Sequence, residues 1–535
     1  MKEQSTTKGF AILSAAGMAV KILSVIYIPL MMKIIGDEGY GLYGASYQVY
    51  AFVFVLTNSG IPVAISKLIS ELNAVGNYKD AVRGFKIARF ILVVLGIVMA
   101  SFLIIFSEPL ANITKYKKAY LSLLTLAPAI FFTSIASAYR GYFQGRANMT
   151  PTAVSQVIEQ IVNTIFALIF AAYLMRYGVE VGCTGGPIGT SFGALASAAF
   201  LIYCYEKNKK IRLPQNYVEV SRTRLSTSQL VGKIVKYGVP ITLCVGMTYA
   251  GSVVDLANTK TRLMAGGISD INATILYGYL NKYQQLLNVP IAIISSLSAA
   301  ILPAISAAAA VKDKKRVKDK INYSFRLCFL IAIPCTVGFS VLSGHIYELL
   351  KFRGGYYIME CGSIVLVLMS IMQIQTTILQ SVGKLFTATF YSIIGIVVKI
   401  CINYVLIAIP NINILGAIVG SIGGFVIPII LNHIIIRKSL NAKVSLIRHA
   451  VKPGIASVMM GAVVFASCFV MDFLFGFIKI PYVSNALSTI LSVLVGAVTY
   501  VFIMALIGGI RKKDMELLPG AARKLMPGFI LRIIR

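Results

Sequence analysis

The sequence predicts an all-α polytopic membrane protein with about 14 transmembrane helices. Of its 535 residues, 57% are apolar and only 13% are charged. A soluble protein keeps about a quarter of its residues charged, and the mean hydropathy here is +0.81. This composition excludes an ordinary soluble enzyme and a disordered chain, because most of the sequence is suited to lipid rather than water.

Each expected element follows from the length of an apolar run. A bilayer core takes about 20 mostly apolar residues per helix. The first run extends from Phe10 to Met32, which is too long for a signal peptide, so it is expected as the first span. Fourteen spans are expected in all, at residues 9–33, 42–66, 86–106, 119–143, 151–175, 186–205, 238–258, 275–305, 325–347, 358–382, 387–409, 412–436, 453–476 and 486–510.

The distribution of positive charge predicts the orientation of these spans. The formal net charge is +31, which in a soluble chain would suggest nucleic acid as a partner. Cytoplasmic loops carry an excess of Lys and Arg, and alternate connections here hold 37 of these residues against 10 in the others. We therefore expect a cell-membrane protein with both termini in the cytoplasm, anionic membrane lipids as partners, and no nucleic acid.

A repeat with an offset of about 240 residues divides the chain. The segment IPVAIS at 61–66 corresponds to LPAIS at 302–306, and Gly145-Arg146 corresponds to Gly383-Lys384. Transporters are commonly built from repeated helical bundles. We expect two pseudo-symmetric six-helix bundles plus two C-terminal helices and a basic amphipathic cytoplasmic tail, at residues 1–220, 221–450, 451–510 and 511–535. A solvated tail is the alternative to an amphipathic one.

Two lysines within the spans are candidates for substrate binding. An ionised side chain in the membrane costs several kcal/mol and survives mainly beside a partner or a water-filled cavity. Lys21 lies near the middle of the first span, with Ser14 and Ser24 on the same helical face. Snorkelling to the interface is the alternative, and it is stronger for the second lysine. That lysine lies in the eighth span among further polar candidates: Lys282, with Asn281, Gln285 and Asn288.

Three other charged residues within the spans are candidates for gating. Glu159 and Lys399 occupy corresponding positions of the repeat, 240 residues apart, which predicts an ion pair between the lobes. The alternative for the polar stripe around Glu159 is hydrogen bonding between neighbouring helices. Asp255 lies near the outer end of the seventh span and is expected as an ion ligand or a counter-charge.

No pattern in the sequence predicts a catalytic or metal-binding residue. The eight cysteines are scattered singly, and the three histidines lack the spacing of metal ligands. There is no Walker loop for ATP. We expect a transporter without a cofactor, driven by H⁺ or Na⁺ coupling or by the membrane potential, which supplies about 2.3 kcal/mol per charge per 100 mV.

Four motifs give the chain a family resemblance along essentially its whole length. They are GYGLYG at 39–44, LTNSGIPVAISKLISE at 56–71, YRGYFQG at 139–145 and TPTAVSQVIEQ at 150–160. In these motifs the chain resembles the stage V sporulation protein B branch of the multidrug/oligosaccharidyl-lipid/polysaccharide exporter superfamily, which also contains the MurJ and Wzx flippases.

The resemblance implies two bundles around a central cavity and outward transfer of an undecaprenyl-diphosphate-linked sugar by alternating access. In MurJ-type members, basic residues of helices 1 and 8 face the cavity, and Lys21 and Lys282 stand at those positions. Tyr27 stands where those members have a second helix 1 arginine. The resemblance also assigns a groove for the lipid tail to the last two helices.

Two other functions remain open, together with the expectation of a monomer. A MATE-type cation or drug antiporter of the same fold would need membrane-embedded carboxylates, which Glu159 and Asp255 could supply. A membrane-embedded glycan polymerase or transferase would show acidic or histidine clusters in large outer loops. The longest outer connections, near 259–274 and 346–357, hold few such residues.

Overall fold

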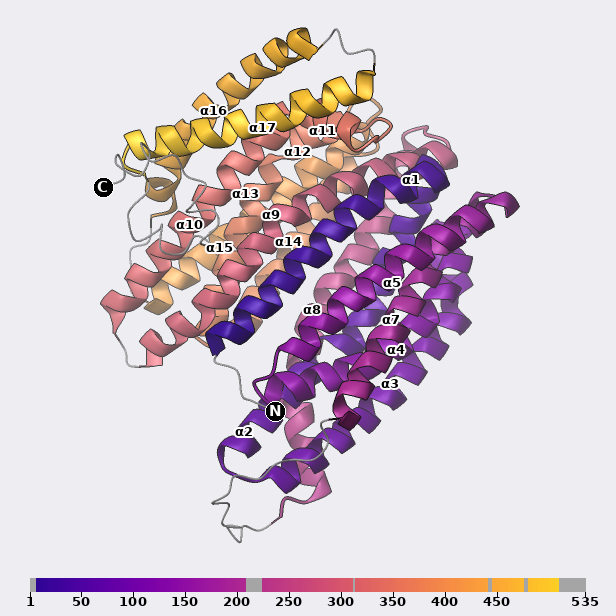
Figure 1. The fold of residues 1–535 in the computed structure, drawn as a ribbon, viewed down its shortest axis with the longest axis vertical. Coiled ribbons are helices and arrows are strands. Elements are labelled where there is room, and N and C mark those ends of the chain that lie inside the picture. The colour runs from indigo at the N-terminus through magenta and orange to yellow at the C-terminus, as the bar shows by residue number, and fades with distance from the viewer. Residues whose placement is uncertain (1–5, 208–223, 311–312, 441–444, 476–479, 510–535) are drawn as a thin grey trace. The chain divides into compact units, whose positions relative to one another are not determined.

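The computed structural model describes residues 6–207, 224–310, 313–440, 445–475 and 480–509 (Figure 1). Every element in these ranges is helical, so the predicted all-α fold is confirmed. The expected tail, 511–535, lies outside the described residues. The longer helices are α1 (Thr6–Asn58), α2 (Gly60–Ala74), α3 (Tyr78–Ile113), α4 (Tyr120–Gly145), α5 (Thr150–Leu174), α7 (Gly185–Lys207), α8 (Thr227–Ala265), α9 (Asp270–Ala310), α10 (Lys314–Val341), α13 (Ile364–Ser381), α14 (Leu385–Leu406), α15 (Gly416–Leu440), α16 (Leu446–Phe475) and α17 (Pro481–Leu506).

Short helices occupy several of the connections. They are α6 (Val179–Gly182), α11 (Ser343–Leu349), α12 (Tyr356–Gly362) and the 3₁₀ turns η1 (Lys117–Ala119), η2 (Met175–Tyr177) and η3 (Asn413–Leu415). The structure therefore fills part of the expected outer connection 346–357 with helix. This segment packs within its own unit, where it covers the candidate Lys282.

Twelve segments of the described residues are long and apolar enough to span a membrane. The predicted multi-pass architecture is confirmed, but the predicted number of fourteen is not. One segment, Ala15–Asn73, overlaps both of the expected spans 9–33 and 42–66. Within it, two helices join directly at a kink at Gly36, whose non-helical φ of 70° is accessible to glycine at little cost. The expected span 275–305 lies in α9, which is not among the twelve.

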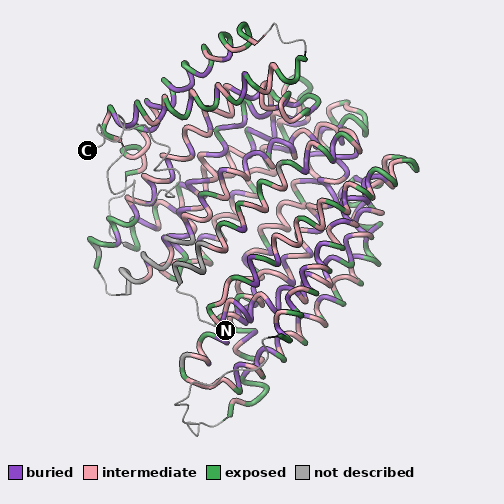
Figure 2. The backbone as a smooth tube through the Cα atoms, viewed as in Figure 1, coloured by how far each residue is buried: buried purple, intermediate pink, exposed green. Residues whose placement is uncertain are grey.

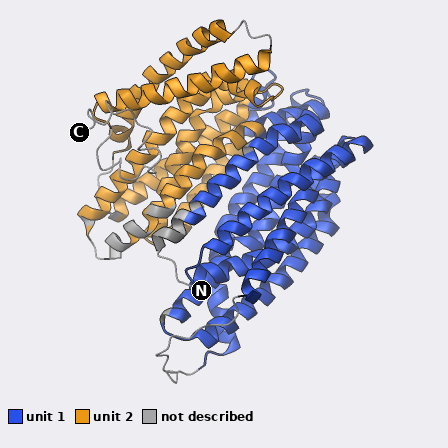
Figure 3. Ribbon diagram, in the orientation of Figure 1, with its two compact units in different colours: residues 1–281, 403–414 blue, residues 282–402, 415–535 orange. Residues whose placement is uncertain are grey.

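The helices group into two compact units (Figure 3). Unit 1 comprises residues 1–281 and 403–414, and unit 2 comprises 282–402 and 415–535. Unit 1 includes α8, which the expected boundary at 220 assigned to the second lobe. This helix approaches α2 so closely that a Cβ atom on Gly60 would lie 2.0 Å from the carbonyl oxygen of Gly238. The four-part division of the chain stays a prediction.

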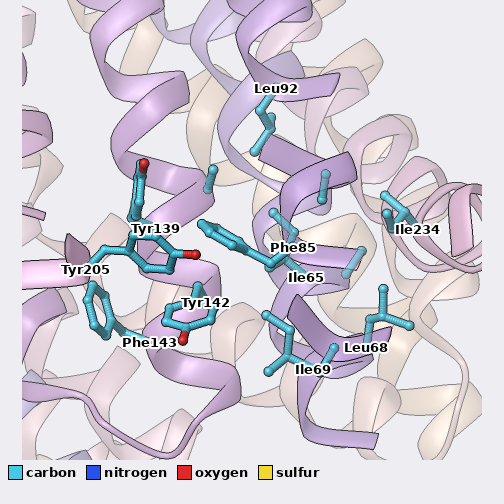
Figure 4. Packing of buried hydrophobic residues seen from close by; sticks show 14 of the residues in the cluster. Ile65, Leu68, Ile69, Phe85, Leu92, Tyr139, Tyr142, Phe143, Tyr205 and Ile234 are labelled. Atoms are coloured by element: carbon cyan, nitrogen blue, oxygen red, sulfur yellow. The ribbon is translucent and has the colours of Figure 1, made fainter. Parts of the chain in front are cut away.

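An aromatic cluster forms the core of unit 1 near the start of α3 (Figure 4). The ring of Phe85 lies 4.6 Å from that of Tyr142 and 5.2 Å from that of Tyr205, between ring centroids. Leu68 of α2 and Leu230 of α8 are fully buried against the same cluster. Because a buried Phe contributes about 3–5 kcal/mol when compared with Ala, this cluster fixes α2, α3, α4, α7 and α8 together.

The described residues of unit 2 form two buried clusters. One joins α9, α10, α13 and α15 around Phe325 and Ile374. The other joins α10, α16 and α17 around Met460, Val464 and Tyr500. The last two helices are thus packed onto α10 through a core of their own.

The outward faces of the helices remain apolar, as a lipid environment requires. Buried and exposed residues alternate along single helices (Figure 2). Large apolar side chains on these faces are well exposed, for example Phe90 at 69%, Val458 at 69% and Phe473 at 86%. Contiguous apolar surface on this scale is unusual for a soluble monomer, and it agrees with the membrane spans that the sequence predicts.

Connections expected on the same side of the membrane meet in unit 1. At one end, Lys118 pairs with Glu38 at 3.1 Å and with Glu180 at 3.9 Å, and all three were expected outside. At the other end, Arg83 donates to the carbonyl oxygen of Leu225 at 3.0 Å, and both were expected inside. The alternation of the spans is therefore consistent, while the assignment of the cytoplasmic side stays a prediction.

Candidate functional site

The most enclosed of the predicted site residues is Lys282 in α9. Its side chain is fully buried at 0% exposure. The Nζ atom donates a hydrogen bond to the carbonyl oxygen of Arg353 at 3.2 Å and lies 5.6 Å from the ring centroid of Phe352. Both partners belong to the connection between α11 and α12 in the same unit. The ammonium group is therefore covered by a segment expected on the outer side of the membrane.

The next residue of α9 anchors this arrangement. The Tyr283 hydroxyl donates to the carbonyl oxygen of Gly362 at 2.7 Å. Only glycine fits at position 362, because a Cβ atom there would lie 2.8 Å from the Tyr283 ring and hydroxyl. The connection that covers Lys282 is thus held to α9 at the C-terminal end of α12.

The polar neighbours Asn281, Gln285 and Asn288 are half-buried on α9. Asn281 lies directly against α1 within unit 1, where a Cβ atom on Gly44 would fall 1.7 Å from its Nδ2 atom. A Cβ atom on Gly41 would likewise fall 2.2 Å from the carbonyl oxygen of Thr274. The glycines of the GYGLYG motif therefore allow α1 and the first turns of α9 to touch along their backbones.

Lys21 lies on a more open face of α1. Its side chain is exposed, and a Cβ atom on Gly17, one turn earlier, would meet nothing within 4 Å. The Ser24 hydroxyl donates to the carbonyl oxygen of Val20 at 2.9 Å. The side chain of Ser14 lies outside the described residues. Lys21 belongs to unit 1 and Lys282 to unit 2, so their joint binding of one ligand stays a prediction.

Glu159 of α5 has a partner that sequence reasoning missed. Arg140 of α4 donates from Nη2 to its Oε2 at 2.6 Å. The same guanidinium donates to the hydroxyls of Ser155 at 3.2 Å and Ser197 at 2.8 Å. Hydrogen bonds between charged groups, such as that between the guanidinium and the carboxylate, are stronger than hydrogen bonds between neutral groups. The Glu159 carboxylate is therefore neutralised within unit 1.

The expected pairing of Glu159 with Lys399 remains a prediction, because Lys399 belongs to unit 2. There it packs on α15, where a Cβ atom on Gly424 would lie 2.9 Å from the Lys399 Cβ. A signal for Arg140 was present in the sequence. Arg140 stands within the YRGYFQG motif, near the end of the expected span 119–143, and α4 continues past it to Gly145.

Asp255 has a hydrogen-bond partner on α14. The Nδ2 atom of Asn403, on α14, donates to Oδ1 of Asp255, on α8, at 2.6 Å. Asn403 is fully buried, and Asp255 is half-buried. The two side chains join α8 to the end of α14 inside unit 1.

The described residues contain no group of three or more His, Cys, Asp or Glu side chains that could hold a metal ion. The eight cysteines are all unpaired as thiols, four of them buried. Among the charged groups that the structure encloses are cations with oxygen partners, such as Lys282 and Arg140. Such groups can bind or position anions, and they offer no nucleophile poised beside a general base.

These features define a class of protein, an all-helical polytopic membrane transporter with cationic side chains enclosed between its helices. The chain belongs to the polysaccharide biosynthesis protein family, whose model matches residues 6–309. The resemblance to exporters of this superfamily that the motifs carry is thereby confirmed.

Two relatives from Bacillus subtilis (strain 168) match most of the chain. Stage V sporulation protein B is 27% identical and aligns with 84% of this chain and 87% of its own length. The lipid II flippase MurJ is 25% identical and aligns with 97% of this chain and 98% of its own length. Both relatives are therefore matched across both units rather than over a single bundle.

Solved structures show the same fold. An inward-facing MATE multidrug resistance transporter of the MOP superfamily superimposes with a TM-score of 0.67 at 14% identity, covering 80% of this chain and 98% of that one. The lipid II flippase MurJ, in an inward closed conformation, gives 0.66 at 16% identity, covering 93% and 98%. MurJ is named a flippase and the MATE protein a transporter, which is consistent with a function other than catalysis.

Proposed function

We propose that this protein is a flippase that moves an undecaprenyl-diphosphate-linked saccharide from the inner to the outer leaflet by alternating access. The saccharide lipid is lipid II or a related precursor of the cell wall or of a surface polysaccharide. Family membership and the likeness to a lipid II flippase over nearly the whole chain support this proposal. The observation that carries it is the buried ammonium group of Lys282.

A diphosphate group cannot cross hydrocarbon without compensation of its charge. Lysine supplies three donors on a flexible stem, and bonds from an ammonium to a phosphate oxygen are about twice as strong as neutral hydrogen bonds. In the structure the Lys282 ammonium donates to the carbonyl oxygen of Arg353. A diphosphate oxygen would replace this neutral acceptor, so substrate binding and release of the α11–α12 connection would be coupled.

The remaining candidate residues have supporting roles in this proposal. Lys21 provides the second positive charge for the diphosphate, and Ser24, Asn281, Gln285 and Asn288 bind its oxygens or the first sugar. Glu159 and Lys399 hold or gate the lobes. No bond is made or broken, and no cofactor is required. Energy comes from ion coupling, in which Asp255 is a candidate ligand, or from the membrane potential acting on the lysines.

The proposal predicts that Lys21→Ala and Lys282→Ala each abolish complementation of a strain that lacks its lipid flippase. Gln284→Ala is the matched control, because Gln284 is an exposed neighbour of Lys282 on α9. Protein levels in the membrane should be normal in all three variants, since neither lysine contributes to a buried hydrophobic cluster. Complementation by both lysine variants at normal levels would refute the role of the lysines.

Depletion of the protein identifies the substrate. The lipid-linked sugar that accumulates on the inner leaflet is the one the protein transports, and its glycan distinguishes a general wall precursor from one used in sporulation. Accumulation of no lipid-linked sugar would argue against the proposed function as a whole.

A MATE-type cation antiporter is the second candidate, favoured by the fold and by the half-buried Asp255 carboxylate beside Asn403. The ion pair between Arg140 and Glu159 weakens this alternative, because it occupies the other membrane carboxylate. An antiporter would show drug efflux driven by H⁺ or Na⁺ that Asp255→Asn abolishes, with no change in lipid-linked sugars.

A further inference from the structure

The segment that covers Lys282 is attached on its other side to the last two helices. Helix α11 lies against the first turn of α17 (Figure 1). The Nδ2 atom of Asn485 donates to the carbonyl oxygen of His345 at 3.2 Å, and the Tyr482 hydroxyl donates to that of Leu349 at 3.3 Å. The start of α17 therefore holds α11 at two carbonyl groups that lie one turn apart.

A pair of side chains joins α11 to the end of α16. The His345 Nε2 atom lies 3.1 Å from Oδ2 of Asp472. Because a carboxylate only accepts hydrogen bonds, this ring nitrogen carries the proton. The buried Ser488 hydroxyl of α17 donates to the other carboxylate oxygen at 2.7 Å. Asp472 is thus held in place by α17 while it binds α11.

The turn after α11 has a conformation that its surroundings must maintain. Lys351 has a φ of 55°, in the left-handed region that residues other than glycine rarely adopt, and two glycines follow with φ of 66° and 85°. Such a backbone costs free energy and persists where its contacts hold it. The Lys351 ammonium lies 4.1 Å from the ring centroid of Tyr482. Helix α17 therefore also stabilises the turn that covers Lys282.

An aromatic contact couples α11 to this turn. The ring of Tyr347 on α11 packs edge-on against that of Phe352, with 5.3 Å between the centroids, and both side chains are buried. The Phe352 ring in turn lies 5.6 Å from the Lys282 ammonium. We call residues 343–355 the lid. Contacts within unit 2 therefore run without a break from the ends of α16 and α17, through the lid, to Lys282.

We propose that His345 and Asp472 are positioning residues that hold the lid over Lys282, so that their bond must open before a diphosphate binds there. The inference rests on the proposed function, which makes Lys282 a ligand of the diphosphate. The Arg353 carbonyl oxygen and a diphosphate oxygen would compete for the same ammonium group. The pair therefore sets the fraction of molecules in which Lys282 is available, and with it the apparent affinity for the substrate.

This role differs in sign from a purely structural one. If the pair only stabilised the fold, its loss would weaken binding of the diphosphate. If the pair holds a competing lid closed, its loss strengthens binding, because a larger fraction of the protein is then competent to bind. The two roles are therefore distinguished by the direction of the change.

The reactivity of Lys282 in the purified full-length protein measures the lid without any substrate. A water-soluble acetylating reagent modifies this amine only while the lid is open. Mass spectrometry compares its acetylation with that of Lys315, which is exposed. His345→Ala and Asp472→Ala should each raise the relative rate about threefold to tenfold, as expected for one partly exposed hydrogen bond. The double variant should match the single ones, and an unchanged rate in both single variants would overturn the proposal.

Two matched variants separate this bond from a general loosening of α11. His345→Gln keeps a donor for Asp472, and its rate should stay within about twofold of that of the unmodified protein. Glu348→Gln removes a charge from an exposed position of the same helix and should also stay within about twofold. A rate in Glu348→Gln as high as in Asp472→Ala would overturn the role of the pair.

Binding of undecaprenyl diphosphate in detergent tests the competition. Its apparent affinity should rise about threefold to tenfold in Asp472→Ala, and Asp472→Ala should bring no gain in a Lys282→Ala background. A weaker affinity in Asp472→Ala would show that the pair serves only the fold and would contradict the proposal. No binding by the unmodified protein would refute the proposed function instead, and the acetylation rates would still decide whether the pair holds the lid.

Discussion

In each unit, one end was expected on the cytoplasmic side. The basic side chains at these two ends have different surroundings. In unit 1, Arg89 lies over the rings of Phe85 and Tyr139 at 5.8 Å and 5.9 Å, and Arg146 lies over that of Tyr142 at 5.6 Å. The cavity that Arg146 and Tyr142 line there measures about 10 Å³. In unit 2, basic side chains of α10 and α16 border a cavity of about 740 Å³.

This difference separates structural charges from charges available for binding. An arginine that stacks on a buried ring gains about 1 kcal/mol and fills space with its aliphatic stem. A lysine or arginine at the rim of an open cavity gains little without a ligand.

The largest expected effect concerns the enclosed ion pair of unit 1. Arg140→Ala should destabilise the protein by about 3–5 kcal/mol, because it leaves the Glu159 carboxylate without its partner. The Arg140 side chain is only 16% exposed, and the Glu159 side chain is only 27% exposed. Thermal unfolding in detergent measures the loss, and Arg140→Met/Glu159→Met should recover most of it.

An exposed pair in the same unit is the control. Lys67 and Glu71 are 4.0 Å apart with side chains 54% and 39% exposed, so Lys67→Ala should cost less than about 1 kcal/mol. Equal effects of Lys67→Ala and Arg140→Ala would remove the distinction between structural and solvated charges.

A smaller effect is expected where α1 touches α9. Gly44→Ala places a methyl group where the Asn281 amide lies, and such overpacking costs about 1–3 kcal/mol. Gly17→Ala on the same helix meets nothing within 4 Å and should be neutral or slightly stabilising. Unfolding temperatures of the two variants compare them directly, and destabilisation by Gly17→Ala as large as that by Gly44→Ala would contradict the close approach of the helices.

The smallest effect is expected for the basic cavity of unit 2. Lys318→Gln/Arg448→Gln should change the free energy of unfolding by no more than about 0.5 kcal/mol, since both side chains line the cavity and are exposed. The measurement uses the protein in a neutral detergent with phosphatidylcholine alone. A loss of several kcal/mol under these conditions would make the cavity charges structural, like those of unit 1.

Much of the fold could be predicted from the sequence, because apolar runs of span length have few alternatives in a membrane. The number of spans was harder to predict. Gly36 allows α1 to kink and continue, and hydropathy does not distinguish a kinked helix from two helices with a loop. The grouping of α8 with unit 1 depends on the close approach at Gly60 and Gly238, which composition does not reveal.

For the candidate site, the sequence indicated which charges are costly but not which groups satisfy them. Lys282 was expected as a substrate-binding cation beside a cavity, whereas in the structure it donates to a backbone carbonyl in a distant connection. Glu159 was identified as well, but its partner Arg140 lies near the end of a helix, where a basic residue is ordinarily solvated. Backbone acceptors and pairs between helices require the three-dimensional packing.

Transport by purified protein in sealed vesicles tests the central claim most directly. The vesicles would hold a fluorescent undecaprenyl-diphosphate saccharide, and a membrane-impermeant quencher would measure its movement between leaflets. The account predicts movement that requires the protein, that persists in Gln284→Ala, and that falls to the protein-free rate in Lys282→Ala. Movement at an equal rate in Lys282→Ala, or none with the unmodified protein, would contradict it.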